Sequence, residues 1–298
     1  MEPLLEVTPA GWWVETGLFY VALGAYLTAG FGYGWNLLGR REWGVVASAT
    51  LRGAMLLHAG FLIARWANLG RVPLVGHYEF GNFLIWVLAL AYLRAERRRL
   101  PGYRAVGATV SLFLAAYIAY ITLFPMVSSL HRPLPPVLRY PLWLNIHVTT
   151  SALGYAGFSL AMAVALLWLV RERLASAAPA GGAPSTTPIR AALDFIPDSA
   201  TLEHYMHEAA TFGFLWHTAM IISGGIWADA AWGRYWGWDP KETWSLVTWV
   251  VFAIYLHARL TRGWRGRNTV YLVILGWAVM LFTWLGVAYL LPGIHAFG

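Results

Sequence analysis

The sequence predicts an all-α polytopic membrane protein whose helices pack into one bundle. Of its 298 residues, 59% are hydrophobic and only 12% are charged, whereas soluble domains usually contain about 25% charged residues. Long apolar runs recur along the chain, and arginines gather at their ends. This placement follows the positive-inside rule, so we attribute the net charge of +7 to membrane topology and expect no nucleic-acid partner.

Eight apolar runs approach the roughly 20 residues that a membrane-spanning helix needs. In chain order, the predicted helices are 14–39, 44–69, 79–95, 103–125, 143–171, 206–228, 241–261 and 269–291. The connections after the first, third, fifth and seventh helices are rich in arginine, which is typical of cytoplasmic loops. We therefore expect both termini, and the connection after the sixth helix, on the outer (periplasmic or extracytoplasmic) face of a bacterial cytoplasmic membrane.

A segment rich in small residues and proline divides the chain into five helices and three. Residues 172–203 include ASAAPAGGAPSTTP, which has the composition of a flexible linker. The arginine pattern places this linker on the cytoplasmic side, between a first region at 1–171 and a second at 204–298. Residues 199–208 are predicted to form an amphipathic helical lead-in to the sixth helix, at the inner surface. The simplest arrangement of the two regions is a single helical bundle in which a flexible linker joins them.

The outward connection at 229–242 belongs to the most distinctive stretch, AWGRYWGWDPKETW. Tryptophan and tyrosine gather at membrane interfaces in any case. Four tryptophans within fourteen residues, Trp232, Trp236, Trp238 and Trp244, are a much higher density than that tendency explains. We therefore expect a platform for a large, flat, apolar guest.

The same stretch contains a helix-start pattern. Asp239 suits the N-cap, Pro240 the first helical position and Glu242 the third. The seventh helix should therefore begin at Pro240 and hold Trp236 and Trp238 in a defined pose.

WGRYWGWDPKETW, continued by SLVTWVVFAIYLH, closely resembles the WWD signature of haem-handling membrane proteins. Within that group it is similar to the CcsA (ResC) subunit of the system II cytochrome c synthetase. GHYEFGNFLIW at 76–86, LWLNIHVTTSALGYAGF at 142–158 and the C-terminal LPGIHAFG resemble further segments of this family. In the first of these, His77 and Phe80 replace more usual residues. The likeness covers about 76–298 in pieces.

The resemblance implies that His147 and His295 are the two outward haem-iron ligands, and imidazole suits that role. It also implies an intramembrane ligand at His257. The partner of His257 could be His58, His217 or a histidine of a separate CcsB (ResB)-like subunit. His77 and His131 match no ligand of the family, and we expect both at the surface.

Other residues are candidates for binding the haem ring or its propionates. The signature implies ring contacts by Trp232, Trp236, Trp238 and Asp239, although capping alone accounts for Asp239. Arg234 and Arg52 could each pair with a propionate through bidentate bonds. For Arg52, an ion pair with Glu79 or snorkelling to the inner surface explains the charge equally well.

The resemblance implies cytochrome c maturation by an enzyme of the holocytochrome c synthase (haem lyase) type. Haem b would be a transient guest and substrate, held at the outward site while cysteines of a Cys-X-X-Cys-His motif in apocytochrome c form thioether bonds. The expected partners are apocytochrome c, a CcsB (ResB)-like membrane subunit and a thioredoxin-like thiol reductant. The chain has no cysteine, which excludes disulfides and thiolate chemistry of its own. We assign no general acid or base.

Three other functions stay open at this point. One is a haem exporter that loads a chaperone without ligation. Another is a dihaem b-type electron-transfer protein, which would need facing histidine pairs within the membrane. The third is a transporter of an apolar solute, with the tryptophans as its gate. The outward positions of His147 and His295 favour a transient guest over permanent haems.

Overall fold

The computed structural model describes residues 5–98, 102–134, 138, 141–177, 193–291 and 293. These residues are predominantly helical and include no β-strand. The last predicted helix contains a π-helical turn, η2, and continues as a short final helix. Each predicted helix is present, with the bounds α1 (Pro9–Leu37), α2 (Arg41–Leu69), α3 (Gly76–Arg97), α4 (Arg104–Leu123), α5 (Pro141–Ala177), α7 (Ser199–Trp232), α8 (Pro240–Thr261), α9 (Arg267–Leu281), η2 (Phe282–Gly286) and α10 (Val287–Leu290).

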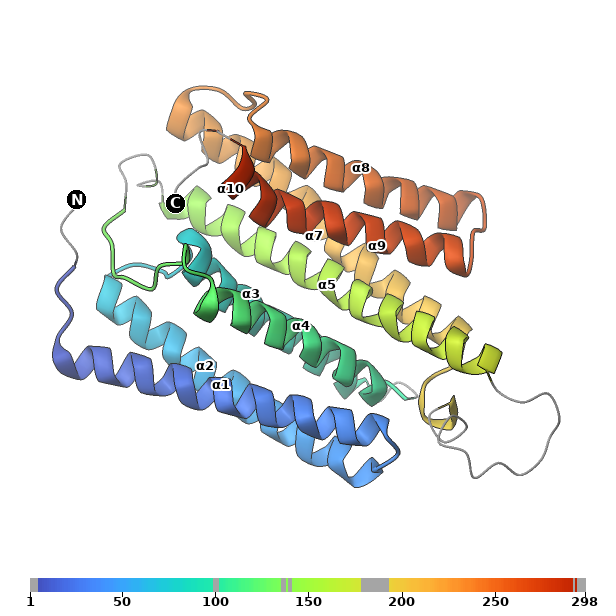
Figure 1. Ribbon diagram of the computed structural model, residues 1–298. Coiled ribbons are helices and arrows are strands. Elements are labelled where there is room, and N and C mark those ends of the chain that lie inside the picture. The colour runs from blue at the N-terminus through green and yellow to red at the C-terminus, as the bar shows by residue number, and fades with distance from the viewer. Residues whose placement is uncertain are drawn as a thin grey trace.

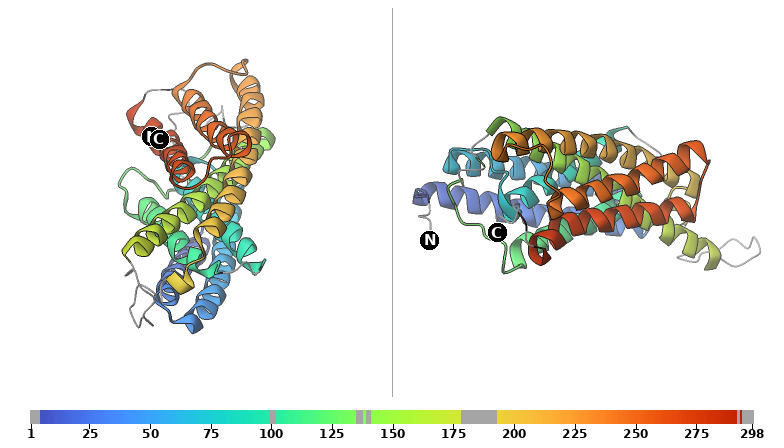
Figure 2. Two further views of the ribbon diagram at one scale, coloured as in Figure 1. Left: turned by 90° about the vertical axis from the view of Figure 1, so that its right-hand side faces the viewer. Right: turned by 90° about the horizontal axis from the view of Figure 1, so that it is seen from above.

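The long helices run along one common direction and form a flattened bundle (Figures 1 and 2). The start of α1, the α7–α8 connection and α10 lie at one end, which we call the loop end (Figure 1). The end of α5 and the start of α7 lie at the other, which we call the linker end (Figure 1). Helices therefore alternate in direction along the chain, as the arginine pattern predicts. Which end faces the cytoplasm stays a prediction.

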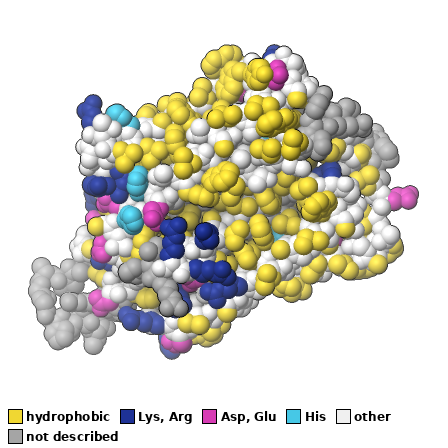
Figure 3. Space-filling view, turned by 180° about the vertical axis from the view of Figure 1, so that it is seen from behind, with side chains coloured by type: hydrophobic (Ala, Val, Ile, Leu, Met, Phe, Trp, Pro, Cys, Tyr) yellow, Lys and Arg dark blue, Asp and Glu magenta, His cyan; other side chains and the backbone are white. Residues whose placement is uncertain are grey.

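Within the described residues, seven helices are long and apolar enough to cross a membrane, with α9 to α10 counted as one. The one predicted span that is not among these seven is α3. It is more polar than the others because it carries Glu79, Asn82 and Glu96. All three side chains are buried and hydrogen-bonded inside the bundle. Hydrophobic side chains cover much of the surface, and Lys and Arg gather toward one end of the face in Figure 3. The prediction of an all-α polytopic membrane protein is confirmed.

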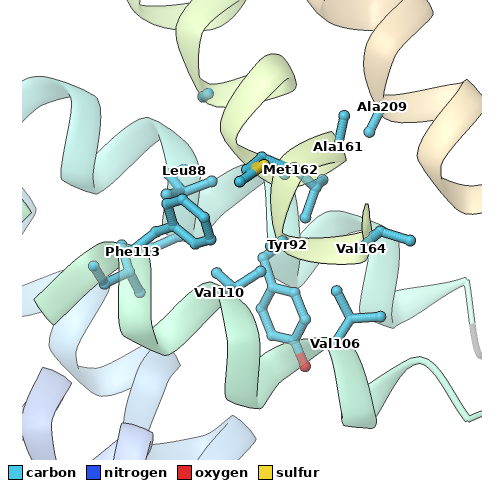
Figure 4. Packing of buried hydrophobic residues seen from close by; sticks show 14 of the residues in the cluster. Leu88, Tyr92, Val106, Val110, Phe113, Ala161, Met162, Val164 and Ala209 are labelled. Carbon is cyan, nitrogen blue, oxygen red and sulfur yellow. The ribbon is translucent and has the colours of Figure 1, made fainter. Parts of the chain in front are cut away.

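Helix α5 forms the centre of the bundle and packs against α3, α4, α7 and α9. Leu88 of α3, Phe113 of α4 and Met162 of α5 meet in this core (Figure 4). Helices α5 and α7 approach so closely that a Cβ at Gly157 would lie 2.6 Å from Cα of Gly213. Small residues at helix crossings allow this close packing, which drives association where lipid is as apolar as the side chains.

The predicted lead-in at 199–208 is helical and continues directly into the sixth predicted span, because α7 runs unbroken from Ser199 to Trp232. Asp198 starts this helix by accepting a hydrogen bond from the Thr201 N–H, at 2.9 Å. The other end of α7 differs from the prediction. The helix continues to Trp232, so the connection between α7 and α8 is 233–239 and not 229–242. Residues 178–192 of the predicted linker lie outside the described residues.

The prediction that His131 is a surface residue is wrong. Its Nε2 lies 2.9 Å from a carboxylate oxygen of Glu15 on α1, and its side chain is only 11% exposed. The guanidinium of Arg65 bonds both Glu15, at 2.7 Å, and Glu79, at 3.3 Å. Burying these charges is tolerable because each is paired. This cluster joins α1, α2 and α3 at the loop end.

Candidate functional site

A cavity of about 320 Å³ opens at the loop end, between α5, α7, the start of α8 and the η2–α10 segment. This volume lies at the lower end of the range typical of cofactor sites, about 300–1,000 Å³, which are mostly apolar with a few placed polar groups. The lining has that character. Its members include Phe80, Leu144, Tyr155, Met220, Trp227, Trp236, Trp284 and Tyr289, with His77, His147, Lys241, Glu242 and Ser245 among the polar ones.

His147 lies on α5 and lines this cavity, and the contact between α5 and α7 sets the orientation of its ring. Its Nδ1–H donates to the carbonyl oxygen of Met220 on α7, at 3.0 Å. Gly224 makes room for the ring, since a Cβ there would lie 2.8 Å from its Cε1. In a neutral imidazole, a proton on Nδ1 leaves the lone pair on Nε2. An imidazole whose other nitrogen donates to a carbonyl is the usual arrangement of a metal-binding histidine.

Tryptophans lie behind and beside this histidine. Trp227 stacks on His147 with ring centroids 6.0 Å apart and planes at 14°, and the edge of Trp232 meets Trp227 at 4.8 Å. Trp236 lines the cavity itself, whereas Trp238 is 67% exposed. The four rings therefore form a layered aromatic wall rather than one flat platform. Trp227 precedes the signature and was not predicted.

The predicted helix start is confirmed. Asp239 caps α8 by accepting from the Lys241 N–H at 3.1 Å. The Glu242 carboxylate accepts from the N–H groups of Gly237, at 2.7 Å, and Asp239, at 3.1 Å. Between them, Trp238 has a φ of 56°, a left-handed conformation that is rare outside glycine. These hydrogen bonds hold the connection in that strained shape, and strain of this kind concentrates at functional sites.

The prediction that His77 is a surface residue is also wrong. His77 starts α3, lines the cavity, and its Nδ1 lies 2.8 Å from the hydroxyl of Tyr120. Its ring stacks on Tyr289 with centroids 5.2 Å apart and planes at 23°. Its partners lie on α4 and α10, far away in sequence, so no local pattern could reveal them.

His295, the second predicted outward ligand, lies outside the described residues. Gly293, two residues earlier, is described and sits against the cap of α8. A Cβ at Gly293 would lie 2.6 Å from a carboxylate oxygen of Asp239. Gly293 therefore lies beside the α7–α8 connection, and ligation by His295 stays a prediction.

Comparisons with known proteins show the family of this chain. The family model described as "Cytochrome C assembly protein" matches residues 74–295. A Synechococcus elongatus protein named "Cytochrome c biogenesis protein CcsA" is 34% identical over 286 residues, covering 85% of this chain and 87% of that one. A Guillardia theta protein of the same name is 36% identical over 242 residues, covering 78% and 79%. The chain belongs to the cytochrome c assembly protein family.

A solved structure supports the fold of this family member. The chain superposes on "Cytochrome c Heme Lyase CcmF" with a TM-score of 0.69 and 18% identity. The match covers 95% of this chain and 48% of the other, so the chain spans about half the length of that protein. With the family shown, this chain is a multi-pass membrane protein of cytochrome c maturation.

The predicted intramembrane histidines of this family member fall in different surroundings. His58 is buried, with Nδ1 3.2 Å from the Tyr26 hydroxyl and Nε2 3.2 Å from the Asn82 side-chain oxygen. His217 is fully buried on α7, and its Nε2–H donates to the carbonyl of Ser245 at 3.0 Å.

His257, by contrast, is exposed on the outer side of α8. Helix α8 packs mainly on α7, α9, η2 and α10, whereas α2, which carries His58, packs mainly on α1 and α3. His217 turns inward toward Tyr155 and Phe158 of α5. These contacts do not bring His257 together with either predicted partner in the chain.

The two arginines considered for the propionates do not line the cavity. Arg52 lies on the linker-end half of α2, where its guanidinium donates to Ser48 at 2.8 Å and lies 3.9 Å from Glu96. Its carboxylate neighbour is thus Glu96, not Glu79. Arg234 is exposed and lies across Gly237, where an added Cβ would be 2.8 Å from its Cζ.

Proposed function

We propose that this chain holds haem in the loop-end cavity while two cysteines of an apocytochrome c Cys-X-X-Cys-His motif bond to its vinyl groups. The observation that carries this proposal is His147, whose Nδ1–H donates to the Met220 carbonyl. That bond puts the metal-binding lone pair on Nε2, in a histidine that lines an apolar, aromatic cavity. Haem would use both features, because its iron takes the Nε2 lone pair and its flat, largely apolar ring suits the aromatic cavity.

Each side chain then has a role that its surroundings support. His147 binds the iron from the α5 side, and His295 is proposed as the second ligand. Trp236 and Trp284 contact the ring, while Trp227 and Trp232 back His147. We propose Trp238, which is exposed beside the cavity, for contact with the ring edge or the arriving apocytochrome.

The proposed reaction needs positioning rather than acid or base catalysis by this chain. Each thiol S–H adds across one vinyl double bond, so that sulfur bonds to one vinyl carbon and hydrogen to the other. No electrons are lost or gained in that addition. Holding thiol and vinyl together makes the addition effectively unimolecular, which can remove a large part of its barrier. The substrate is proposed to be haem b, which has two vinyl groups.

His257 points to a second subunit. An exposed intramembrane histidine is costly unless it has a partner, and the described residues offer only Thr261, 3.3 Å from its Nδ1. We propose that a CcsB (ResB)-like subunit covers this face of α8 and supplies the opposing haem ligand. In this assembly, located in the bacterial cytoplasmic membrane, a thioredoxin-like reductant would keep the apocytochrome thiols reduced.

The test is co-expression of the chain with a CcsB-like subunit and an apocytochrome that contains Cys-X-X-Cys-His. Haem should become covalent, so that acid–acetone no longer extracts it. His147→Ala should lower covalent product by at least about 100-fold, because loss of a ligand should exceed the 10–100-fold typical of outer-shell changes. His204→Ala is the matched control, since that side chain is 63% exposed at the linker end.

The outcomes separate the alternatives. Undiminished covalent product in His147→Ala contradicts the proposal. Haem that co-purifies with the wild-type chain without becoming covalent favours a loader that passes haem to a chaperone.

A further inference from the structure

Two hydrogen-bond donors on the cavity wall have no acceptor among the described residues. The indole N–H of Trp236 is buried and unpartnered. Lys241 lines the same cavity, and the ion pairs within the described ranges join Arg or His to Glu, never Lys241. Buried polar groups in folded proteins nearly always have partners. The buried Trp236 N–H therefore indicates that a ligand supplies its acceptor, at a cavity that Lys241 also lines.

The neighbouring carboxylates are engaged in the helix cap. Asp239 accepts from the backbone N–H of Lys241 at 3.1 Å, and its negative charge also acts on the Lys241 ammonium. Glu242 accepts from the N–H groups of Gly237 and Asp239. The α8 cap thus uses both acidic side chains to hold the loop, beside the cavity that Lys241 lines.

The residue type points to the same ligand chemistry. Lys241 is the only lysine among the 21 basic residues of the chain. Lysine ends in a compact ammonium on a flexible stem, whereas arginine presents a broad planar fork. A compact charge can reach one carboxylate inside a cavity of about 320 Å³ that aromatic rings also fill.

We propose that Lys241 and the Trp236 indole N–H together bind one carboxylate of the guest, a haem propionate. This inference rests on the proposed function. In haem, the two propionates leave one edge of the porphyrin and the vinyl groups lie on other edges. Anchoring a carboxylate at the start of α8 therefore sets the rotation of the ring about its iron, and with it the direction in which the vinyls face.

The test compares haem with haem dimethyl ester, which lacks both carboxylates, by titration of the purified full chain in detergent and Soret absorbance. The wild-type chain should bind haem about tenfold or more tightly than the ester, the range for one hydrogen bond to a charged group. Lys241→Met should lose that preference, and Lys241→Arg should keep most of it. Trp236→Phe retains the ring and should lower the preference severalfold. Arg132→Met, an exposed charge on the connection after α4, should leave it unchanged.

Equal affinity of the wild-type chain for haem and its ester overturns this inference while leaving the proposed function standing. A preference for haem over the ester that is retained in Lys241→Met also overturns it. Loss of that preference in Arg234→Met alone overturns it too, because the carboxylate would then be bound by Arg234. If the wild-type chain binds neither compound, the proposed function fails with it. If Lys241→Met does not fold, as judged by gel filtration and circular dichroism, Trp236→Phe decides, and an unchanged preference there counts against the inference.

Discussion

His147 and His58 both lie on long helices of the bundle, and both were predicted from the sequence to bind haem. His58 has a partner on each nitrogen, Tyr26 on one side and Asn82 on the other, and aromatic rings close around it. His147 has a carbonyl on Nδ1 and a cavity beside its ring. The residue type is the same in the two cases. The difference lies in the surroundings, because His58 is enclosed in the core whereas His147 lines a cavity.

This contrast suggests two different uses of one residue type. A buried imidazole that is bonded on both sides ties three helices together, because neither nitrogen can be released without leaving a polar group unpaired. An imidazole whose Nδ1–H donates to a carbonyl and whose ring lines a cavity is oriented in the way that is usual for a metal-binding histidine. We therefore propose His58 as a structural residue, and His147 as the ligand that the family resemblance implies.

The largest expected effect tests the structural side of this contrast. His58→Leu removes both hydrogen bonds and leaves the Tyr26 hydroxyl and the Asn82 side-chain oxygen unpaired in the core. Each unsatisfied group costs about 1–3 kcal/mol, so the free energy of unfolding should fall by at least that amount. Thermal unfolding in detergent, followed by circular dichroism, measures the loss, and His204→Leu is the exposed control. Haem binding at the loop end should be unchanged in the folded fraction. Normal stability with reduced haem content would instead make His58 a ligand.

A smaller effect is expected on the functional side. A Cβ at Gly224 would meet both Cε1 and Nδ1 of His147 at 2.8 Å, which is closer than van der Waals contact. Gly224→Ala should therefore rotate or displace the imidazole and lower haem affinity about tenfold, since small misplacements of a positioned group are costly. Gly24→Ala is the matched control, because nothing lies within 4 Å of that added Cβ. Unchanged haem affinity in Gly224→Ala would mean that the ring orientation of His147 does not matter.

Local patterns in the sequence were sufficient for the helices and for one part of the site. Apolar length and arginine placement located each span, and the order Asp-Pro-Lys-Glu located the start of α8 at Pro240. His77, Trp227 and Lys241 were not predicted as cavity residues, because their roles depend on contacts between α3, α5, α7, α8 and α10. The polar partners of His58 and His131 were missed for the same reason. No spacing rule reports which side chain of one helix meets which of another.

The smallest effect concerns Asp239, which belongs to the signature but serves α8. Its carboxylate caps the helix and touches the C-terminal segment at Gly293. Asp239→Ala should cost about 1 kcal/mol of stability through the lost cap, whereas asparagine caps nearly as well. If Asp239 acts only by holding Trp236 and Trp238 in place, Asp239→Asn should retain haem affinity and Asp239→Ala should weaken it. Soret titration of both variants decides. An equal loss of haem affinity in the two variants would show that the negative charge of Asp239 is needed for binding, in addition to its role as the helix cap.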